Sequence, residues 1–463
     1  MATVNTHHPD YDKMIERWVT CEDVADGQAA IHAKGTRYLP KLKEEKDDDY
    51  KARKCRALFY NATWRTIAGL QGLLFRKQPV INSSSIMDSM IDDITLDGQS
   101  LYDFAYDLSE DALEVGRVGV LVDRAMQSTE GMTEAEVAKL NLRPYLKEYD
   151  AKSIINWRKS VINGINKLSL VVLLESEEIQ ENEFKTVSEP RYKVLDMING
   201  VYRQRLFMID DKDQDVLLSE SYPVINGQFF DYIPFVCIGA DCVGIDVESP
   251  PLEDLVFTNL SHYNVTADYE HGCHYTGLPT AVISGYTKQD ADEKLYIGSP
   301  AAWVFSDPQS KASFLEFTGQ GLTALENNLR SKEQMMAVLG ARMLSSDKKG
   351  IEAADTAAIH RSGENSILSG ISRNISSGLS WALSVMEQWA GGGGDVSIEM
   401  NKEFLGKVIT GQELTALVGS WQSGAISQET LFLNLKRGEI YPDNVEFEEE
   451  QAKIDSTPVI TIV

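Results

Sequence analysis

The stretches that decide the fold are SPPLEDLVFTNLSHYNVTADYEHGCHYTGLP (249–279) and FLEFTGQGLTALENNLRSKEQMMAVLGARML (314–344). Ser249 is a good helix N-cap, the two prolines after it suit a first helical turn, and Glu253 complements the positive end of a helix. Apolar residues then recur at helical spacing until Pro279 stops the segment. The second stretch carries the same spacing, so both predict long helices.

Two helices, over about 252–274 and 322–344, therefore flank an insert of short strands and turns, 279–317. If the helices run antiparallel, the insert is held at one end like a tip on a stalk. A polar loop, 345–356, and a third long helix, 357–389, follow. This plan is unusual for an enzyme and suits a subunit whose stalk helices pack against copies of themselves in a ring.

The segments before the stalk predict a mixed unit of helices and antiparallel strands. Apolar spacing predicts helical segments over 50–75 and 101–115 and a short buried strand over 118–122. Further strands are predicted between 144 and 237, joined by the tight-turn dipeptides Asn199-Gly200 and Asn226-Gly227. These strands cover 154–157, 168–174, 192–198 and 201–209.

The last part of the chain predicts short elements. Residues 396–400 alternate like an edge strand, 410–440 predict two or three short helices, and an acidic tail follows. Trp381 and Trp389 lie off the apolar line of the third long helix, so each is either a core residue or a contact between subunits.

Composition narrows the class of protein. The 463 residues include 44 basic and 70 acidic side chains, a formal net charge of −26, and at this length about three domains are expected. Ordinary apolar and charged fractions exclude collagen and wholesale disorder. The acidic excess argues against a tight grip on nucleic acid or on an anionic membrane surface, but allows DNA to pass without being held.

The apolar runs, the N-terminal sequence and the cysteine content favour a protein that is made and kept in a cytosol. No apolar run is long enough to span a bilayer, and the polar N-terminus lacks the pattern of a signal peptide. The five cysteines are odd in number and sparse, so a disulfide framework is not expected.

The chain carries no phosphate-binding loop, zinc-protease motif, nucleophile elbow or C-x-x-C pair. Asp211, Asp213 and Asp215 alternate as in a calcium loop, but Val216 and Tyr222 stand where Gly and Glu are needed. A solvated hairpin tip is therefore the favoured interpretation.

The nearest approach to a metal cluster is His271, Cys273 and His274, with His262 nine residues before the first of them. On a helix His271 and His274 share a face and Cys273 points elsewhere, so packed or interfacial side chains are favoured over zinc ligands. We predict no catalytic residue, no metal and no cofactor.

Six segments in this order resemble the portal proteins of tailed bacteriophages. They span about 55–395, and their order and spacing carry the resemblance, since none is a catalytic signature. Besides the two stalk stretches, they are NATWRTIAGLQGLLFRKQPVI (61–81), VGRVGVLVD (115–123), PYLKEYDAKSIINWR (144–158) and ENSILSGISRNISSGLSWALSVMEQW (364–389).

Portal proteins form a ring, usually of twelve, at one capsid vertex, and a separate ATP-driven terminase pumps DNA through the central channel. The resemblance implies an α+β portal fold with a wing, a two-helix stem, a small clip, a long wing helix and a helical crown. The implied parts are the wing (1–250), stem helices (251–275 and 321–344), clip (276–320), tunnel loop (345–356), long helix with a wing strand (357–409) and crown or tail (410–463).

The implied function is structural and not enzymatic. The ring would be the channel for DNA packaging and ejection at the portal vertex of the virion, assembled in the host cytoplasm. The implied partners are copies of the same chain in a dodecamer, the large terminase, the head–tail adaptor, the major capsid protein and scaffold, and double-stranded DNA that passes without specific binding. No membrane partner is implied.

The resemblance also assigns candidate site residues. In the tunnel loop, lysines between acids and serines would touch phosphate weakly and release it, and the loop has freedom to move; its residues are Ser346, Asp347, Lys348, Lys349, Gly350 and Glu352. The clip interface would comprise Lys288, Lys294, Trp303, Phe305 and Lys311. Its two aromatic residues suit the clip's own core as well as an anchor for terminase.

Two other functions stay open at this level. One is another head–tail or tail subunit of a virion, which the stalk–insert–stalk order disfavours. The other is a carboxylate-dependent metal nuclease, because 70 acids offer many ligand pairs. The acidic runs, however, fall in expected loops and exposed faces.

Overall fold

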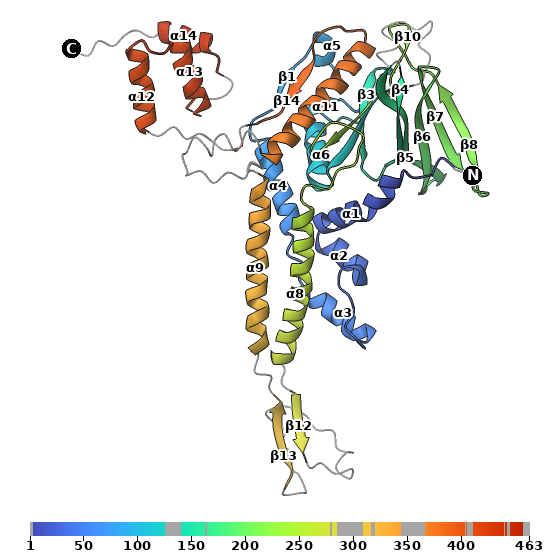
Figure 1. Ribbon diagram of the computed structural model, residues 1–463, viewed down its shortest axis with the longest axis vertical. Helices are drawn as coiled ribbons and strands as arrows, with labels where there is room; N and C mark the ends of the chain where they lie inside the picture. Colours follow the sequence, from blue (N-terminus) through green and yellow to red (C-terminus); the bar gives the residue numbers. More distant parts are fainter. Residues whose placement is uncertain are drawn as a thin grey trace.

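The computed structural model has three visible parts, a body of helices and sheets, a long two-helix stalk with a small sheet at its end, and a group of C-terminal helices (Figure 1). The architecture is α+β with antiparallel sheets, as predicted. The structure describes residues 3–125, 140–162, 164–277, 280–284, 309–315, 320–343, 366–402, 404, 411–438, 440–441 and 445–456.

The N-terminal region is helical. It comprises α1 (Pro9–Asp26), α2 (Gln28–Lys34), the 3-10 turn η1 (Gly35–Arg37), α3 (Asp47–Arg56) and α4 (Ala62–Leu74). The helical segment predicted over 50–75 is broken at 57–61, because the Asn61 side chain accepts a hydrogen bond from Trp64 N (3.0 Å) and starts a new helix there. Asp47, Asp48 and Asp49 form the exposed first turn of α3.

A three-stranded antiparallel sheet lies at the centre of the body. Its order is β11 (Phe235–Gly239), β2 (Arg117–Arg124), β3 (Pro144–Asp150). The helix α6 (Leu101–Glu114) precedes β2 as predicted and is capped by Ser100, which accepts from Asp103 N at 3.1 Å. The short helix α5 (Ser85–Asp88) lies earlier in the chain.

The long helix α11 (Ile367–Trp389) packs against this sheet. Asn374 donates from its amide to the carbonyls of Gly239 and Ala240, at 3.0 and 3.1 Å, and thereby fixes the helix to the end of β11. A Cβ built on Gly378 would lie 2.5 Å from Ile238 Cγ1, so only glycine permits this close approach.

A row of serines on α11 binds the strand β14 (Ser397–Glu399). Ser372 Oγ donates to Asn401 O (2.9 Å), Ser376 Oγ accepts from Met400 N (3.0 Å), and Ser380 Oγ accepts from Ile398 N (3.0 Å). Spaced four residues apart, the three hydroxyls lie on one helix face and satisfy a strand edge. On its other side β14 pairs antiparallel with β1 (Val80–Asn82), which confirms the predicted edge strand.

The second sheet has five antiparallel strands in chain order. They are β4 (Ile154–Ile162), β5 (Ile165–Asn182), β6 (Lys185–Ile198), β7 (Val201–Ile209) and β8 (Asp215–Ser221). Both residues of the Asn199-Gly200 turn have positive φ, 51° and 80°, as the predicted tight turn requires. Asn226-Gly227 likewise joins β9 (Val224–Ile225) to β10 (Gln228–Phe229). Asp211 and Asp213 lie in the exposed turn before β8.

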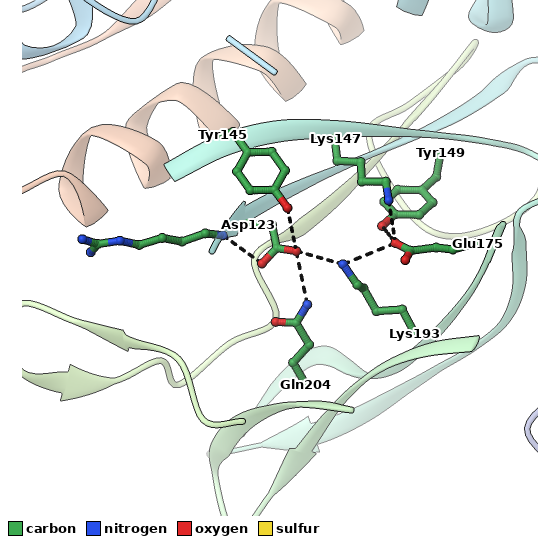
Figure 2. A network of polar contacts seen from close by, with 8 residues as sticks. Asp123, Tyr145, Lys147, Tyr149, Glu175, Lys193 and Gln204 are labelled. Atoms are coloured by element: carbon green, nitrogen blue, oxygen red, sulfur yellow. Dashed lines mark hydrogen bonds and ion pairs between the residues drawn. The ribbon is translucent and has the colours of Figure 1, made fainter. Parts of the chain in front are cut away.

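A buried polar network ties the two sheets together (Figure 2). Lys193 of β6 contacts Asp123 of β2 (Nζ to Oδ2, 2.9 Å) and Glu175 of β5 (Nζ to Oε1, 3.3 Å). Gln204 donates to Asp123 at 3.2 Å, and Lys147 donates to Glu175 at 2.8 Å. Because two carboxylates face two ammonium groups, the network is neutral and its charges are compensated inside the body.

The C-terminal helices are α12 (Gly411–Gln422), α13 (Gln428–Arg437) and α14 (Phe447–Ser456). The first two confirm the helices predicted over 410–440, whereas α14 shows that much of the acidic tail is helical. None of the helices in the described ranges is both long and apolar enough for a membrane span.

Candidate functional site: the two-helix stalk and its tip

The stalk consists of α8 (Glu253–Gly277) and α9 (Gln320–Arg342), which confirms the two predicted long helices. They lie side by side and antiparallel (Figure 1). Thr258 Oγ1 lies 4.0 Å from Met335 Sδ, and Lys332 Nζ donates to Ser261 Oγ at 2.8 Å. At 1.5 Å per residue, α8 alone is about 37 Å long.

The far end of the stalk is held by a close helix crossing. A Cβ built on Gly272 would lie 2.6 Å from Leu322 Cδ2, so glycine lets the leucine side chain pack against the α8 backbone. Nearer the body, the buried His262 ring faces Glu333, with Nε2 3.5 Å from Oε1. Burial lowers the pKa of His262, and the carboxylate opposes this effect.

The near end of the stalk is anchored by one fully buried amide. Asn259 Oδ1 accepts from Ala62 N, Thr63 N and Thr63 Oγ1, each at 3.1 Å, and Asn259 Nδ2 donates to Tyr60 O at 2.8 Å. The Thr63 N–H is an orphan donor of the first turn of α4, whereas the Ala62 N–H also donates to Tyr60 O at 2.8 Å. A residue of the stalk therefore completes the start of a body helix.

A second anchor joins α1 to the first turn of α8. Arg17 forms a two-pronged pair with Glu253 through Nε and Nη2, and its Nη2 also donates to Ser249 Oγ at 3.0 Å. The hydrogen bonds that Arg17 donates to the Glu253 carboxylate raise the pKa of Arg17. A planar guanidinium–carboxylate pair of this kind fixes direction as well as distance. Further along the stalk, Asn264 Nδ2 donates to Tyr38 O at 3.1 Å.

The tip carries a two-stranded antiparallel sheet, β12 (Thr280–Ser284) and β13 (Lys311–Leu315), beyond the far end of both helices (Figure 1). Lys311 is exposed and lies opposite Ser284. The other predicted clip residues, Lys288, Lys294, Trp303 and Phe305, lie outside the described residues. The tunnel-loop residues Ser346, Asp347, Lys348, Lys349, Gly350 and Glu352 lie outside them too.

Much of the stalk surface is uncovered in the single chain. Along the described part of α9 only Met336 is buried, and Met343 is buried just after its end. The predicted apolar face of α9 is otherwise half-buried, as at Leu325 and Leu329. Met335 is 53% exposed, which leaves a large apolar side chain in water.

The remaining candidates from the sequence take structural positions. Trp389 is buried against Phe230, with ring centroids 4.8 Å apart, so it is a core residue and not a surface contact. Trp381 is half-buried beside Tyr232. In the parts of the chain that the structure describes, no cluster of three or more His, Cys, Asp or Glu side chains could hold a metal ion.

Sequence reasoning missed a carboxylate-lined pocket in the body, between α6 and β3. Its volume is about 520 Å³, and its lining comprises Asp107, Glu110, Asp111, Glu148, Tyr149, Asp150 and Ser153. Burial, reinforced by neighbouring carboxylates, raises the pKa of Asp111 to about 7 and that of Glu148 to about 9. The sequence shows that several acidic residues of 107–114 fall on one face of a helix, which could have indicated part of this pocket. It does not show that Glu148 and Asp150 of β3 lie beside them.

Residues 251–390 match DUF4055, a domain of unknown function. That range includes the stalk, the tip and the long helix α11. A search of curated proteins finds no match to the chain.

Three solved structures from gene transfer agent (GTA) particles are similar over most of the chain. The neck of an empty GTA particle, computed with C6 symmetry, gives a TM-score of 0.42 at 10% identity and covers 89% of this chain and 98% of that one. The virion of a native GTA particle gives 0.41 at 11% identity, with 88% and 98% covered. The neck of a native GTA particle, computed with C12 symmetry, gives 0.41 at 10% identity, with 85% and 94% covered.

Proposed function

We propose that this chain is the subunit of a ring-forming portal protein. In this role copies of the chain surround a channel at one vertex of a phage-like capsid, and DNA passes through that channel during packaging and ejection. The observation that carries the proposal is the stalk, an antiparallel helix pair that is anchored to the body at one end, carries a small sheet at the other and is largely uncovered.

The stalk suits lateral association. Its length gives a contact surface that runs parallel to the axis of a ring, and its rigid anchors at Asn259 and Arg17 keep that surface in a fixed direction from the body. Exposed apolar side chains such as Met335 gain most when a neighbouring copy covers them. In a ring each stalk would be covered on two sides.

The charge of the chain suits a channel for moving DNA. Each copy carries a formal charge of −26, so a ring of about twelve copies repels the duplex and offers few places for it to settle. The tunnel loop 345–356 would supply the few cations that touch phosphate. The tip with Lys311 would be the docking site of terminase during packaging and of the adaptor afterwards.

Negative-stain images of the purified full chain test the proposal. Rings with a central hole and about twelve subunits are expected, and native mass spectrometry of the same sample counts the copies. Monomers at every protein and salt concentration tested would overturn it. Magnesium-dependent DNA cleavage by the pure protein, lost on a single Asp→Ala change, would replace it with a nuclease.

A further inference from the structure

One exposed apolar patch lies where α8 and α9 meet near the body. The α8–α9 patch consists of Phe257, Met335 and Val338, which are 52%, 53% and 57% exposed. Thr258 contacts Met335, which places Met335 beside the turn that carries Phe257, and Val338 is one helical turn further along α9. Asp254, one turn before Phe257, is exposed and forms no ion pair with any described residue.

A second patch lies at the start of α4. The α4 patch consists of Leu58, Tyr60 and Trp64, which are 62%, 43% and 50% exposed, together with Arg65. The Arg65 guanidinium lies over the Tyr60 ring, 5.1 Å from its centroid, and makes no ion pair within the described ranges. Both patches are therefore apolar, but this one carries a cation, Arg65, whereas the first one carries an anion, Asp254.

The two patches face away from each other. Asn259 points at the start of α4, and Phe257 precedes it by two residues, which is a rotation of about 200° around α8. On α9, a Cβ at Gly340 would lie 3.1 Å from Thr66 Cγ2, so Gly340 faces α4. Met335 is five residues earlier, about 140° around that helix. The patches thus occupy opposite flanks of the stalk.

The two patches also lie at the same level along the stalk. Asn259 contacts the first residues of α4, and Thr258, the residue before it, contacts Met335. Thr66 is level with Gly340, which is five residues, or about 7.5 Å, from Met335 along the same helix. The patches are therefore within about one and a half helical turns of each other in height, roughly 8 Å.

We propose that the α8–α9 patch of one chain packs on the α4 patch of a second copy, with Asp254 approaching Arg65. This inference rests on the proposed ring and names its contact. Two different patches on opposite flanks define a heterologous interface, in which each copy uses one patch toward each neighbour. Equal height means little axial rise per copy, so the assembly closes into a ring and does not grow as a helical filament.

A mixing experiment tests the pairing. The M335E/V338E variant destroys only the α8–α9 patch, and W64E destroys only the α4 patch. Because all three positions are exposed, both variants should keep the circular-dichroism spectrum and thermal midpoint of the parent chain. Each variant alone should remain monomeric in native mass spectrometry, whereas an equimolar mixture should form dimers and nothing larger, since one intact junction survives. Phe184 lies in a turn of the body and its side chain is 89% exposed, so F184E is the control variant and should still form rings.

Charge exchange gives a second readout. D254K alone should lower the ring fraction at low salt at least fivefold, and the double variant D254K/R65D should restore it. Rings formed by either patch variant, or dimers formed by one variant alone, would overturn the pairing while leaving the proposed portal function in place. A parent chain that never forms rings would overturn both.

Discussion

Lys193 joins the two sheets of the body, and its replacement by methionine has a predictable cost. Its ammonium lies 2.9 Å from Asp123 Oδ2 and 3.3 Å from Glu175 Oε1. The three side chains are only 12%, 7% and 16% exposed. Methionine keeps most of the aliphatic stem, so K193M removes the charge and little of the packing.

The size of the stability loss in K193M depends on which hydrogen-bond and ion-pair partners each carboxylate retains. Breaking a buried pair by removing one partner costs about 3–5 kcal/mol, because the other charge stays buried and uncompensated. Glu175 keeps Lys147 at 2.8 Å, and Asp123 keeps hydrogen bonds from Arg124 N (2.8 Å), Gln204 (3.2 Å) and Tyr145 (3.4 Å) but loses its cation. We therefore expect K193M to lower the unfolding free energy by about 3 kcal/mol, the lower end of this range.

Urea unfolding followed by tryptophan fluorescence measures this loss. Protein concentration must be held fixed, because the proposed assembly would stabilise the folded chain by mass action. K147M is the matched control, since the Lys147 side chain is 41% exposed and its pair with Glu175 is worth at most about 1 kcal/mol. The double variant K193M/D123N removes both charges and should recover part of the stability that K193M loses.

Two results would refute this reasoning. If K193M costs no more than K147M, the buried network does not hold the sheets together. If D123N restores nothing in the K193M background, the cost of K193M is not an uncompensated carboxylate at Asp123.

Two further predictions concern the carboxylate pocket and the stalk anchor. Because the pKa of Asp111 is raised to about 7 and that of Glu148 to about 9, the folded chain keeps protons that unfolded carboxyls release near pH 4. The unfolding free energy should therefore fall as pH rises from about 5 to 9, and E148Q should flatten this slope in urea titrations at both ends; a slope unchanged in E148Q contradicts the prediction. N259L should leave the Thr63 N–H group without its acceptor, at about 1–3 kcal/mol for a buried group, whereas the Ala62 N–H keeps Tyr60 O; hydrogen exchange at the start of α4 should become faster. N264L, which removes only an amide donor to the carbonyls of Tyr38 and Leu260, should cost less, and an equal cost would deny Asn259 its anchoring role.

Sequence predicted the features that depend on local spacing. Both stalk helices, α6, β2 and the Asn-Gly turns follow from periodicity and turn chemistry within one segment, and the structure has them. The pairing of α8 with α9 was also accessible, because the short insert between them favours an antiparallel hairpin.

Features that bring distant residues together were not predicted. Asn259 meets residues almost two hundred positions earlier, and nothing near it in the chain distinguishes it from a solvated asparagine. The same holds for Lys193, whose partners lie on β2 and β5. The strand β3 was not singled out, because its alternation contains Lys147 and Glu148, which the fold places in a polar network and in the carboxylate pocket.

The pairing of β1 with β14 determines when the body can fold during synthesis. Residues 80–82 find their strand partner only at 397–399, and α11, which covers the central sheet, also comes from this late part of the chain. At about 5–20 residues per second, a ribosome needs roughly 15–60 s to travel that distance. During this time the body stays open, and the stalk and tip are synthesised before it can close. A nascent chain must therefore wait for its last third before its body can close, which would delay the proposed ring assembly until translation is nearly complete.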